Sequence, residues 1–223
     1  MGEVASRLAR EGGGTLAVRT VGGEGPTVVW LGGFNSDMTG TKAEALADWA
    51  AAKGRAYVRF DYFGHGQSSG AFVDGTISRW RADTLAVIDE ATEGPLVLVG
   101  SSMGGWLACL AALSRLERIV GLVLVAPAAD FTEKLMTPGP DNAALIEDGA
   151  RWSILDGPVG ITVPVRILQG GADPDVPWRH ALALATAIEA EDLTFTLIKD
   201  GDHRLSRPRD IARLIAAVEE LLS

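Results

Sequence analysis

The chain has 223 residues, of which 47% are hydrophobic and 22% charged, with one cysteine and a formal net charge of −9 at pH 7. This composition can form the core of one domain over residues 1–223. The excess of acidic residues disfavours nucleic acid and anionic membranes as partners. A single cysteine excludes an internal disulfide. Because no apolar run reaches the roughly 18 residues of a membrane span and the N-terminus lacks a signal-peptide core, we expect a cytoplasmic protein without membrane insertion.

Six short apolar runs along the chain predict β-strands. Most of them are apolar throughout and do not alternate with polar residues, which is typical of parallel strands covered on both faces. The runs are TVVWL (27–31), AYVRFD (56–61), PLVLVG (95–100), VGLVLVA (120–126), VRILQG (165–170) and TFTLI (194–198).

Helical patterns lie between these runs. Thr41 and Glu44 have the spacing of a capping box, and an apolar face follows them. Further helical periods cover residues 77–91 and 104–113, and the clearest one covers 208–222, with a proline suited to its first turn. The alternation of strands and helices predicts an α/β protein with a mostly parallel central sheet flanked by helices on both faces.

The stretch from Phe131 to Ile161 interrupts this alternation. It is polar, contains three prolines and has one short helical pattern, around Ala143 to Asp148. Connections of this length are uncommon in compact domains unless they are functional or disordered. We therefore expect a small lid or cap over residues 131–161, with an ordinary surface loop as the alternative.

The segment VGSSMGGWLACLAAL holds a candidate nucleophile, Ser102. Its surroundings, Gly100 to Gly104, have the G-x-S-x-G spacing of a nucleophile elbow, with an apolar strand before and a helical pattern directly after. The same spacing recurs around Ser68, but there a turn-rich segment precedes the serine and no helix follows it. The context therefore favours Ser102 over Ser68.

A serine hydroxyl needs a base to remove its proton, and the chain offers three histidines. His203 lies between the last predicted strand and the last predicted helix, where the chain order serine, acid, histidine places the base. We interpret His180, in the opening turn of a helix, as a surface or packing residue. We expect His65 to support a loop near the site.

The acid that orients the base is expected after the strand at residues 165–170. Asp173 follows the end of this strand by three residues, whereas Asp175 lies beside a helix entry and is the weaker alternative, suited to a cap. Asp202 is adjacent to His203, but neighbouring side chains at a turn seldom face each other. We expect Asp202 to bind loop amides instead.

Two backbone amides are candidates for an oxyanion hole. The amide of Met103 follows the candidate nucleophile at the start of a helix. The amide of Phe34 follows Gly32 and Gly33 in the loop after the first run, and these glycines would let it face the elbow. In comparable enzymes each such donor contributes about 3 kcal/mol to catalysis.

Five blocks of the sequence together resemble a known family. They are WLGGFNSDMTGTKA, RFDYFGHGQSSG, VGSSMGGWLACLAAL, QGGADPDVPW and GDHRLS. In this order they resemble the α/β-hydrolase superfamily, most closely its compact branch of acyl-protein (palmitoyl) thioesterases and mycophenolic acid acyl-glucuronide esterase. The resemblance implies an α/β-hydrolase fold, a triad of Ser102, Asp173 and His203, and oxyanion donors at Phe34 and Met103.

These residues predict a serine hydrolase that cleaves small-molecule carboxylic esters or thioesters through an acyl-enzyme, with no metal or organic cofactor. A peptidase, a lactonase or a carbon–carbon hydrolase on the same fold stays an alternative, as does a non-catalytic ligand-binding protein. We expect a pocket for an apolar acyl group of small to medium size, although any of its walls could be simple core. The predicted walls are Phe34, Trp106, Phe131, Leu135, Met136, Trp152, Val176 and Trp178.

Three arginines follow the candidate base closely. Arg204, Arg207 and Arg209 lie before and within the first turn of the last predicted helix, where cations oppose the helix dipole. One hypothesis is that they attract a carboxylate-bearing leaving group such as a glucuronate. The alternative is a solvated basic patch on an acidic protein.

Overall fold

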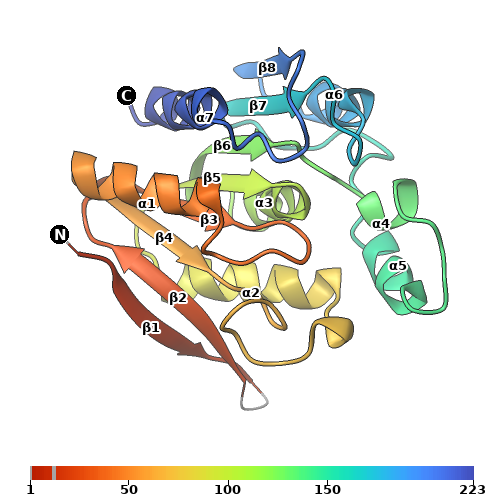
Figure 1. The fold of residues 1–223 in the computed structure, drawn as a ribbon, viewed down its shortest axis with the longest axis horizontal. Helices are drawn as coiled ribbons and strands as arrows, with labels where there is room; N and C mark the ends of the chain where they lie inside the picture. The colour runs from red at the N-terminus through yellow and green to blue at the C-terminus, as the bar shows by residue number, and fades with distance from the viewer. Residues whose placement is uncertain (1, 12–13) are drawn as a thin grey trace.

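The computed structural model describes residues 2–11 and 14–223 (Figure 1). The strands are β1 (Val4–Ala9), β2 (Thr15–Val21), β3 (Glu24–Leu31), β4 (Arg55–Phe60), β5 (Leu96–Ser101), β6 (Ile119–Val125), β7 (Val165–Gly170) and β8 (Leu193–Ile198). The helices are α1 (Thr41–Lys53), α2 (Ile77–Glu90), α3 (Met103–Ser114), α4 (Phe131–Lys134), α5 (Ala143–Ala150), α6 (Trp178–Ala187) and α7 (Pro208–Leu221), with a short 3₁₀ turn, η1 (Phe72–Asp74).

The eight strands form one sheet in the order β1-β2-β4-β3-β5-β6-β7-β8. Strands β3 to β8 are parallel, and β2 runs antiparallel to both β1 and β4. The predicted mostly parallel sheet is therefore confirmed, with all six predicted strands present. Strands β1 and β2, which precede the first predicted run, were not predicted. β1 is an exposed edge strand whose sequence carries little burial pattern.

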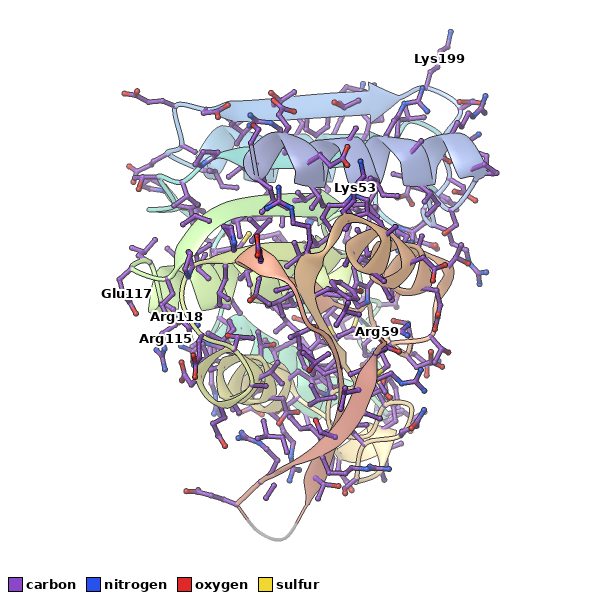
Figure 2. All side chains as sticks on the ribbon, turned by 90° about the vertical axis from the view of Figure 1, so that its left-hand side faces the viewer. Lys53, Arg59, Arg115, Glu117, Arg118 and Lys199 are labelled. Atoms are coloured by element: carbon purple, nitrogen blue, oxygen red, sulfur yellow. The ribbon has the colours of Figure 1, made fainter. Side chains whose placement is uncertain are left out.

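Helices cover both faces of this sheet, as predicted. Alternate residues of the central strands point to opposite sides, so that Leu96 and Leu98 join one core cluster while Val97 and Val99 join the other. The first cluster packs against α2, α3 and α6. The second packs against α1 and α7, which contact each other along one side of the molecule (Figure 2). The carboxyl ends of the parallel strands are thereby held at one edge.

Helix α1 begins at Thr41, but the predicted capping box is wrong. Gly40 is the N-cap residue and no side chain caps this helix end. The carboxylate of Glu44 instead accepts a hydrogen bond of 2.6 Å from the buried guanidinium of Arg59. A buried cation needs an anionic partner. The ion pair between Glu44 and Arg59 of the neighbouring strand β4 therefore replaces the predicted contact at the helix end.

Residues 131–161, called the cap segment below, lie outside the sheet and carry α4 and α5 (Figure 1). Asp148 of α5 accepts two hydrogen bonds from Ser78 at the start of α2, one from its amide at 2.7 Å and one from its hydroxyl at 2.6 Å. The indole N–H of Trp152 also donates to the Ser78 hydroxyl, at 2.7 Å. The cap segment is thus fastened to α2. Among the described helices, none combines the length and apolarity that spanning a membrane requires.

Candidate active site

Ser102 occupies a sharp turn between the end of β5 and the start of α3. Its φ of 55° lies in the left-handed region that non-glycine residues rarely adopt, which is typical of a strained functional turn. The flanking glycines are required by close approach. A Cβ on Gly100 would lie 2.2 Å from the Gly104 carbonyl oxygen, and one on Gly104 would lie 2.1 Å from the Leu31 oxygen. The geometry is that of the predicted elbow.

The structure brings Ser102, His203 and Asp173 together in one hydrogen-bonded chain. His203 Nε2 lies 3.1 Å from Ser102 Oγ, and His203 Nδ1 lies 2.9 Å from Asp173 Oδ2. An ionised carboxylate only accepts hydrogen bonds, so Nδ1 carries the proton and Nε2 accepts from the serine hydroxyl. This arrangement leaves the imidazole ready to take the proton of Ser102.

The side chain of Asp173 is fully buried, while that of His203 is 22% exposed. Burial alone would raise the pKa of Asp173. Hydrogen bonds from His203 and from the amides of Val176 and Asp175 outweigh burial and hold this pKa below its ordinary value. The carboxylate is therefore charged where it faces the imidazole.

The loop after β3 approaches the elbow closely. A Cβ on Gly33 would lie 3.3 Å from the Cβ of Ser102. Phe34 follows Gly33 and lines the same cleft as Ser102, and Met103 opens helix α3 directly after Ser102. Both predicted residues therefore lie near Ser102, and that their amides form an oxyanion hole stays a prediction.

A cleft of about 520 Å³ contains Ser102 and His203. One wall comes from residues 33–42 after β3, and the other from Arg204 and Ser206 after the histidine. Most residues that line the cleft are polar, and a second cation, Lys42 at the start of α1, lies among them. Lys42 was not predicted as a site residue, because nothing in its surrounding sequence distinguishes it from an ordinary surface lysine.

Of the eight predicted pocket walls, only Phe34 lines this cleft. The ring of Phe131 packs 5.5 Å from that of Phe34 and 5.9 Å from that of Trp106. Leu135, Met136, Trp152 and Val176 belong to the same core cluster. Trp178 lies apart from this cluster, at the start of α6, under the guanidinium of Arg179 at 4.3 Å. That these side chains form an acyl pocket stays a prediction.

The other two histidines make structural contacts. His180 Nε2 lies 2.7 Å from the carbonyl oxygen of Ala129, which ties α6 to the segment after β6. His65 Nδ1 lies 3.1 Å from the Phe63 oxygen, and its ring packs 5.3 Å from that of Trp80. Burial lowers the pKa of both imidazoles. Neither histidine contacts Ser102 in the described structure.

Ser68 and Asp202, which were not predicted to be catalytic, form hydrogen bonds with backbone groups. Ser68 Oγ donates to the Asp61 carbonyl oxygen at 2.5 Å and accepts from the Ala17 amide at 2.9 Å. Asp202 Oδ1 accepts from the amide of Leu205 at 2.9 Å, as expected of a loop carboxylate.

Two of the three arginines are paired with carboxylates. Arg207 binds Asp210 at 2.6 Å and Asp200 at 3.0 Å, and Arg209 also binds Asp200. Of the three, only Arg204 lines the cleft. The carboxylate partners of Arg207 and Arg209 and their absence from the cleft lining favour the alternative, a solvated basic patch, for these two residues.

One group among the described residues has the side-chain spacing of a metal site. Possible ligand atoms of Asp173, Asp175 and His203 all lie within 4.8 Å of one another. The hydrogen bond between His203 Nδ1 and Asp173 uses two of these atoms. We therefore assign the group to the serine–histidine–aspartate chain.

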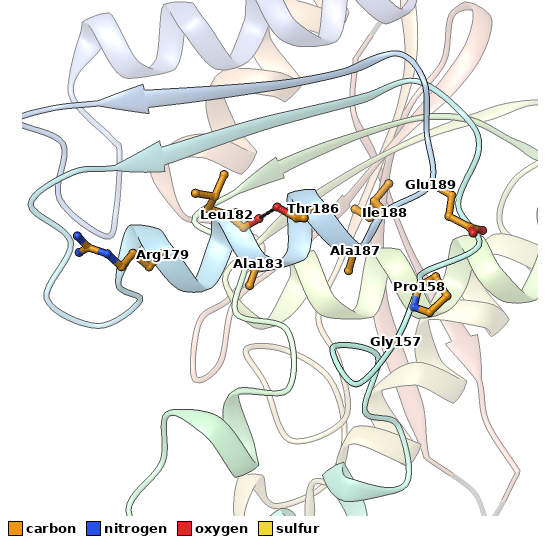
Figure 3. A pocket seen from close by; sticks show the side chains of 9 residues that line it. All are labelled: Gly157, Pro158, Arg179, Leu182, Ala183, Thr186, Ala187, Ile188 and Glu189. Atoms are coloured by element: carbon orange, nitrogen blue, oxygen red, sulfur yellow. Dashed lines mark hydrogen bonds between the residues drawn. The ribbon is translucent and has the colours of Figure 1, made fainter.

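A second cavity, of about 740 Å³, lies on the outer side of α6 (Figure 3). Leu182 and Thr186 of this helix line one side, and Pro158 of the cap segment lines another. It shares no lining residue with the cleft at Ser102. We assign no role to it.

Comparisons with known proteins identify relatives of this chain. Residues 25–149 match the family model Hydrolase_4, described as serine aminopeptidase, S33. The mitochondrial palmitoyl-protein thioesterase ABHD10 of Mus musculus is 34% identical over 93% of this chain and 78% of its own length, and that of Homo sapiens is 33% identical over 93% and 76%.

Two solved structures are similar over their whole length. A protein of Agrobacterium vitis S4 described as a hydrolase is 40% identical, with a TM-score of 0.92 and coverage of 100% of this chain and 99% of the other. Mouse alpha/beta hydrolase domain-containing protein 10 is 33% identical, with a TM-score of 0.93 and coverage of 98% of both chains. Both the sheet and the cap segment therefore have counterparts in solved structures.

Proposed function

This chain belongs to the α/β-hydrolase family of serine hydrolases, and we propose that it cleaves carboxylic esters or thioesters of apolar acyl groups through an acyl-enzyme. The observation that carries the proposal is the hydrogen-bonded chain from Ser102 Oγ through His203 to Asp173, with distances of 3.1 and 2.9 Å. A nucleophile, a base and an orienting acid in this geometry suit acyl transfer.

In the acylation step, Ser102 Oγ attacks the acyl carbonyl carbon while His203 Nε2 takes the serine proton. Asp173 holds the imidazole through Nδ1 and stabilises the imidazolium that forms. The amides of Phe34 and Met103 donate to the oxyanion of the tetrahedral intermediate. His203 then gives its proton to the leaving alcohol or thiol, and the acyl group stays on Ser102.

In the deacylation step, His203 removes a proton from water, which attacks the acyl-enzyme carbonyl. The second tetrahedral intermediate collapses, Ser102 regains its proton and the carboxylic acid leaves. The aromatic rings of Phe34, Phe131 and Trp106, packed 5.5 and 5.9 Å apart, would form the apolar side of the site. The relatives named as thioesterases support thioesters as substrates. Those relatives are named as mitochondrial proteins, so the expected cytoplasmic location of this chain stays a prediction.

A fluorophosphonate probe and graded substrates test the proposal. We expect wild-type protein to be labelled and to hydrolyse p-nitrophenyl esters and acyl-CoA thioesters faster than amino-acid p-nitroanilides. Ser102→Ala should lose labelling and at least 10³-fold in kcat, because no other group supplies the nucleophile. Ser68→Ala, at the second G-x-S-x-G sequence, should still be labelled. Labelling that survives in Ser102→Ala contradicts the assignment, and preference for the anilides favours a peptidase.

A further inference from the structure

Lys42 lies beside the loop that carries His203. Its Nζ donates to the carbonyl oxygen of Arg204 and lies 3.4 Å from Ser206 Oγ. Ser206 Oγ itself donates to the same carbonyl at 3.1 Å. These acceptors flank Leu205, so one ammonium group on α1 contacts the backbone segment directly after the histidine, across 162 positions in the chain.

The segment held by Lys42 has a backbone conformation that needs support. Leu205 has a φ of 44°, in the left-handed region, and its side chain is buried in the core cluster of α1 and α7. A branched residue persists in this region only where its surroundings fix it. Asp202 Oδ1 fixes the Leu205 amide from within the loop. Lys42 fixes the preceding carbonyl from outside it.

The ammonium group of Lys42 has no ion-pair partner within 4 Å among the described residues, so its nearest partners are this carbonyl and this hydroxyl. Burial lowers the pKa of Lys42 to about 8; Asp202 opposes this shift and Arg204 adds to it. The other titratable groups that line the same cleft are Asp37, Asp175 and His203. Both hydrogen-bond partners of Lys42 lie in one strained loop. These contacts suit a residue that holds this loop in place better than a solvated surface lysine.

We propose that Lys42 is a positioning residue, which holds the loop after β8 so that His203 stays within hydrogen-bond reach of Ser102. The proposal rests on the proposed function, in which His203 is the base. The contact between His203 Nε2 and Ser102 Oγ is 3.1 Å. A displacement of about 1 Å at such a contact can cost about 100-fold in rate.

Kinetics of Lys42→Met, Lys42→Arg and Lys53→Met on a neutral p-nitrophenyl ester test this role. Lys53, at the other end of α1, is 59% exposed and controls for loss of one positive charge (Figure 2). We expect kcat of Lys42→Met to fall 10- to 100-fold with KM within about twofold. Lys42→Arg should recover most of kcat, and Lys53→Met should match wild type. An unchanged kcat, or a loss confined to KM, overturns the proposal.

The pH profile adds a second measurement. Above pH 8 the neutral amine of Lys42 loses its charge-assisted hydrogen bond, so kcat of the wild type should fall as pH rises through about 8. The guanidinium of Lys42→Arg stays protonated and should keep kcat to higher pH. The same alkaline decline in both proteins overturns the proposal.

Hydrogen exchange over residues 199–207 needs no substrate. We expect exchange about 10-fold faster in Lys42→Met than in wild type, and no change in Lys53→Met. Equal exchange in all three proteins overturns the proposal. If wild-type protein hydrolyses no ester or thioester but the exchange difference is present, the proposed function fails while the loop contact stands.

Discussion

At the scale of single residues, the reactivity of each group in the site depends on its hydrogen-bond partner. Ser102 is useful as a nucleophile only because His203 Nε2 accepts its proton, and Nε2 is free only because the Asp173 carboxylate accepts from Nδ1. Chain order predicted these three residues, since each follows its own strand. It could not predict Lys42, whose partner lies 162 positions away and is a backbone carbonyl.

Asp173→Asn tests the orienting role of the acid. The asparagine amide can donate to Nδ1, which moves the imidazole proton to Nε2 and removes the acceptor for Ser102. We expect kcat on a p-nitrophenyl ester to fall about 10⁴-fold. The same measurement on Asp175→Asn is the control, because this exposed carboxylate was the alternative acid. Equal losses in the two variants would contradict the assignment.

At the scale of whole elements, burial patterns predicted six of the eight strands, β3 to β8, and missed β1 and β2 at the antiparallel end of the sheet. Local sequence patterns gave a wrong prediction where a side chain binds a residue of another element. Glu44, predicted to take part in capping α1, instead accepts a hydrogen bond from Arg59 on β4. The cap segment shows the same dependence. Asp130, fully buried after β6, accepts hydrogen bonds from Ser153 Oγ at 2.7 Å, the Leu155 amide at 2.8 Å and the Ile154 amide at 3.0 Å. One carboxylate therefore fixes the far end of the cap segment.

Asp130→Ala tests this anchor. Without the carboxylate, the amides of Ile154 and Leu155 lose their acceptor, so the free energy of unfolding in urea should fall by about 2–4 kcal/mol. Asp130→Asn keeps one acceptor and a residue that tolerates the φ of 54°, so it should lose less. Asp156→Ala is the control, because this exposed carboxylate of the cap segment should leave the unfolding midpoint unchanged. Equal losses for Asp130→Ala and Asp156→Ala would contradict the anchor.

At the scale of the whole molecule, one buried cation joins three distant segments. Arg59 on β4 is 1% exposed and lies beside α1 (Figure 2). Its guanidinium donates to both oxygens of Glu3 at 2.7 Å, to Glu44 at 2.6 Å and to the Met38 carbonyl at 2.8 Å. The residue before β1 is thereby fastened to the helix that carries Lys42. A bidentate pair of this kind is among the stronger ionic contacts in proteins.

Glu3→Gln should weaken this junction in a manner that depends on pH. The hydrogen bond from Arg59 lowers the pKa of Glu3 below 4.5 against the opposing effect of burial, so the carboxylate stabilises the fold above the unfolded pKa and ceases to do so as pH falls through the folded pKa. Urea unfolding at pH 7 should show a loss of about 1–2 kcal/mol, limited because Glu44 still pairs with Arg59. Between pH 4.5 and 3 the difference in unfolding free energy between Glu3→Gln and wild type should shrink. Glu24→Gln, at an exposed position, should show no loss at pH 7 or at pH 3. A loss for Glu3→Gln that stays constant from pH 7 to 3 would show that the charge of Glu3 is not what fastens the start of the chain.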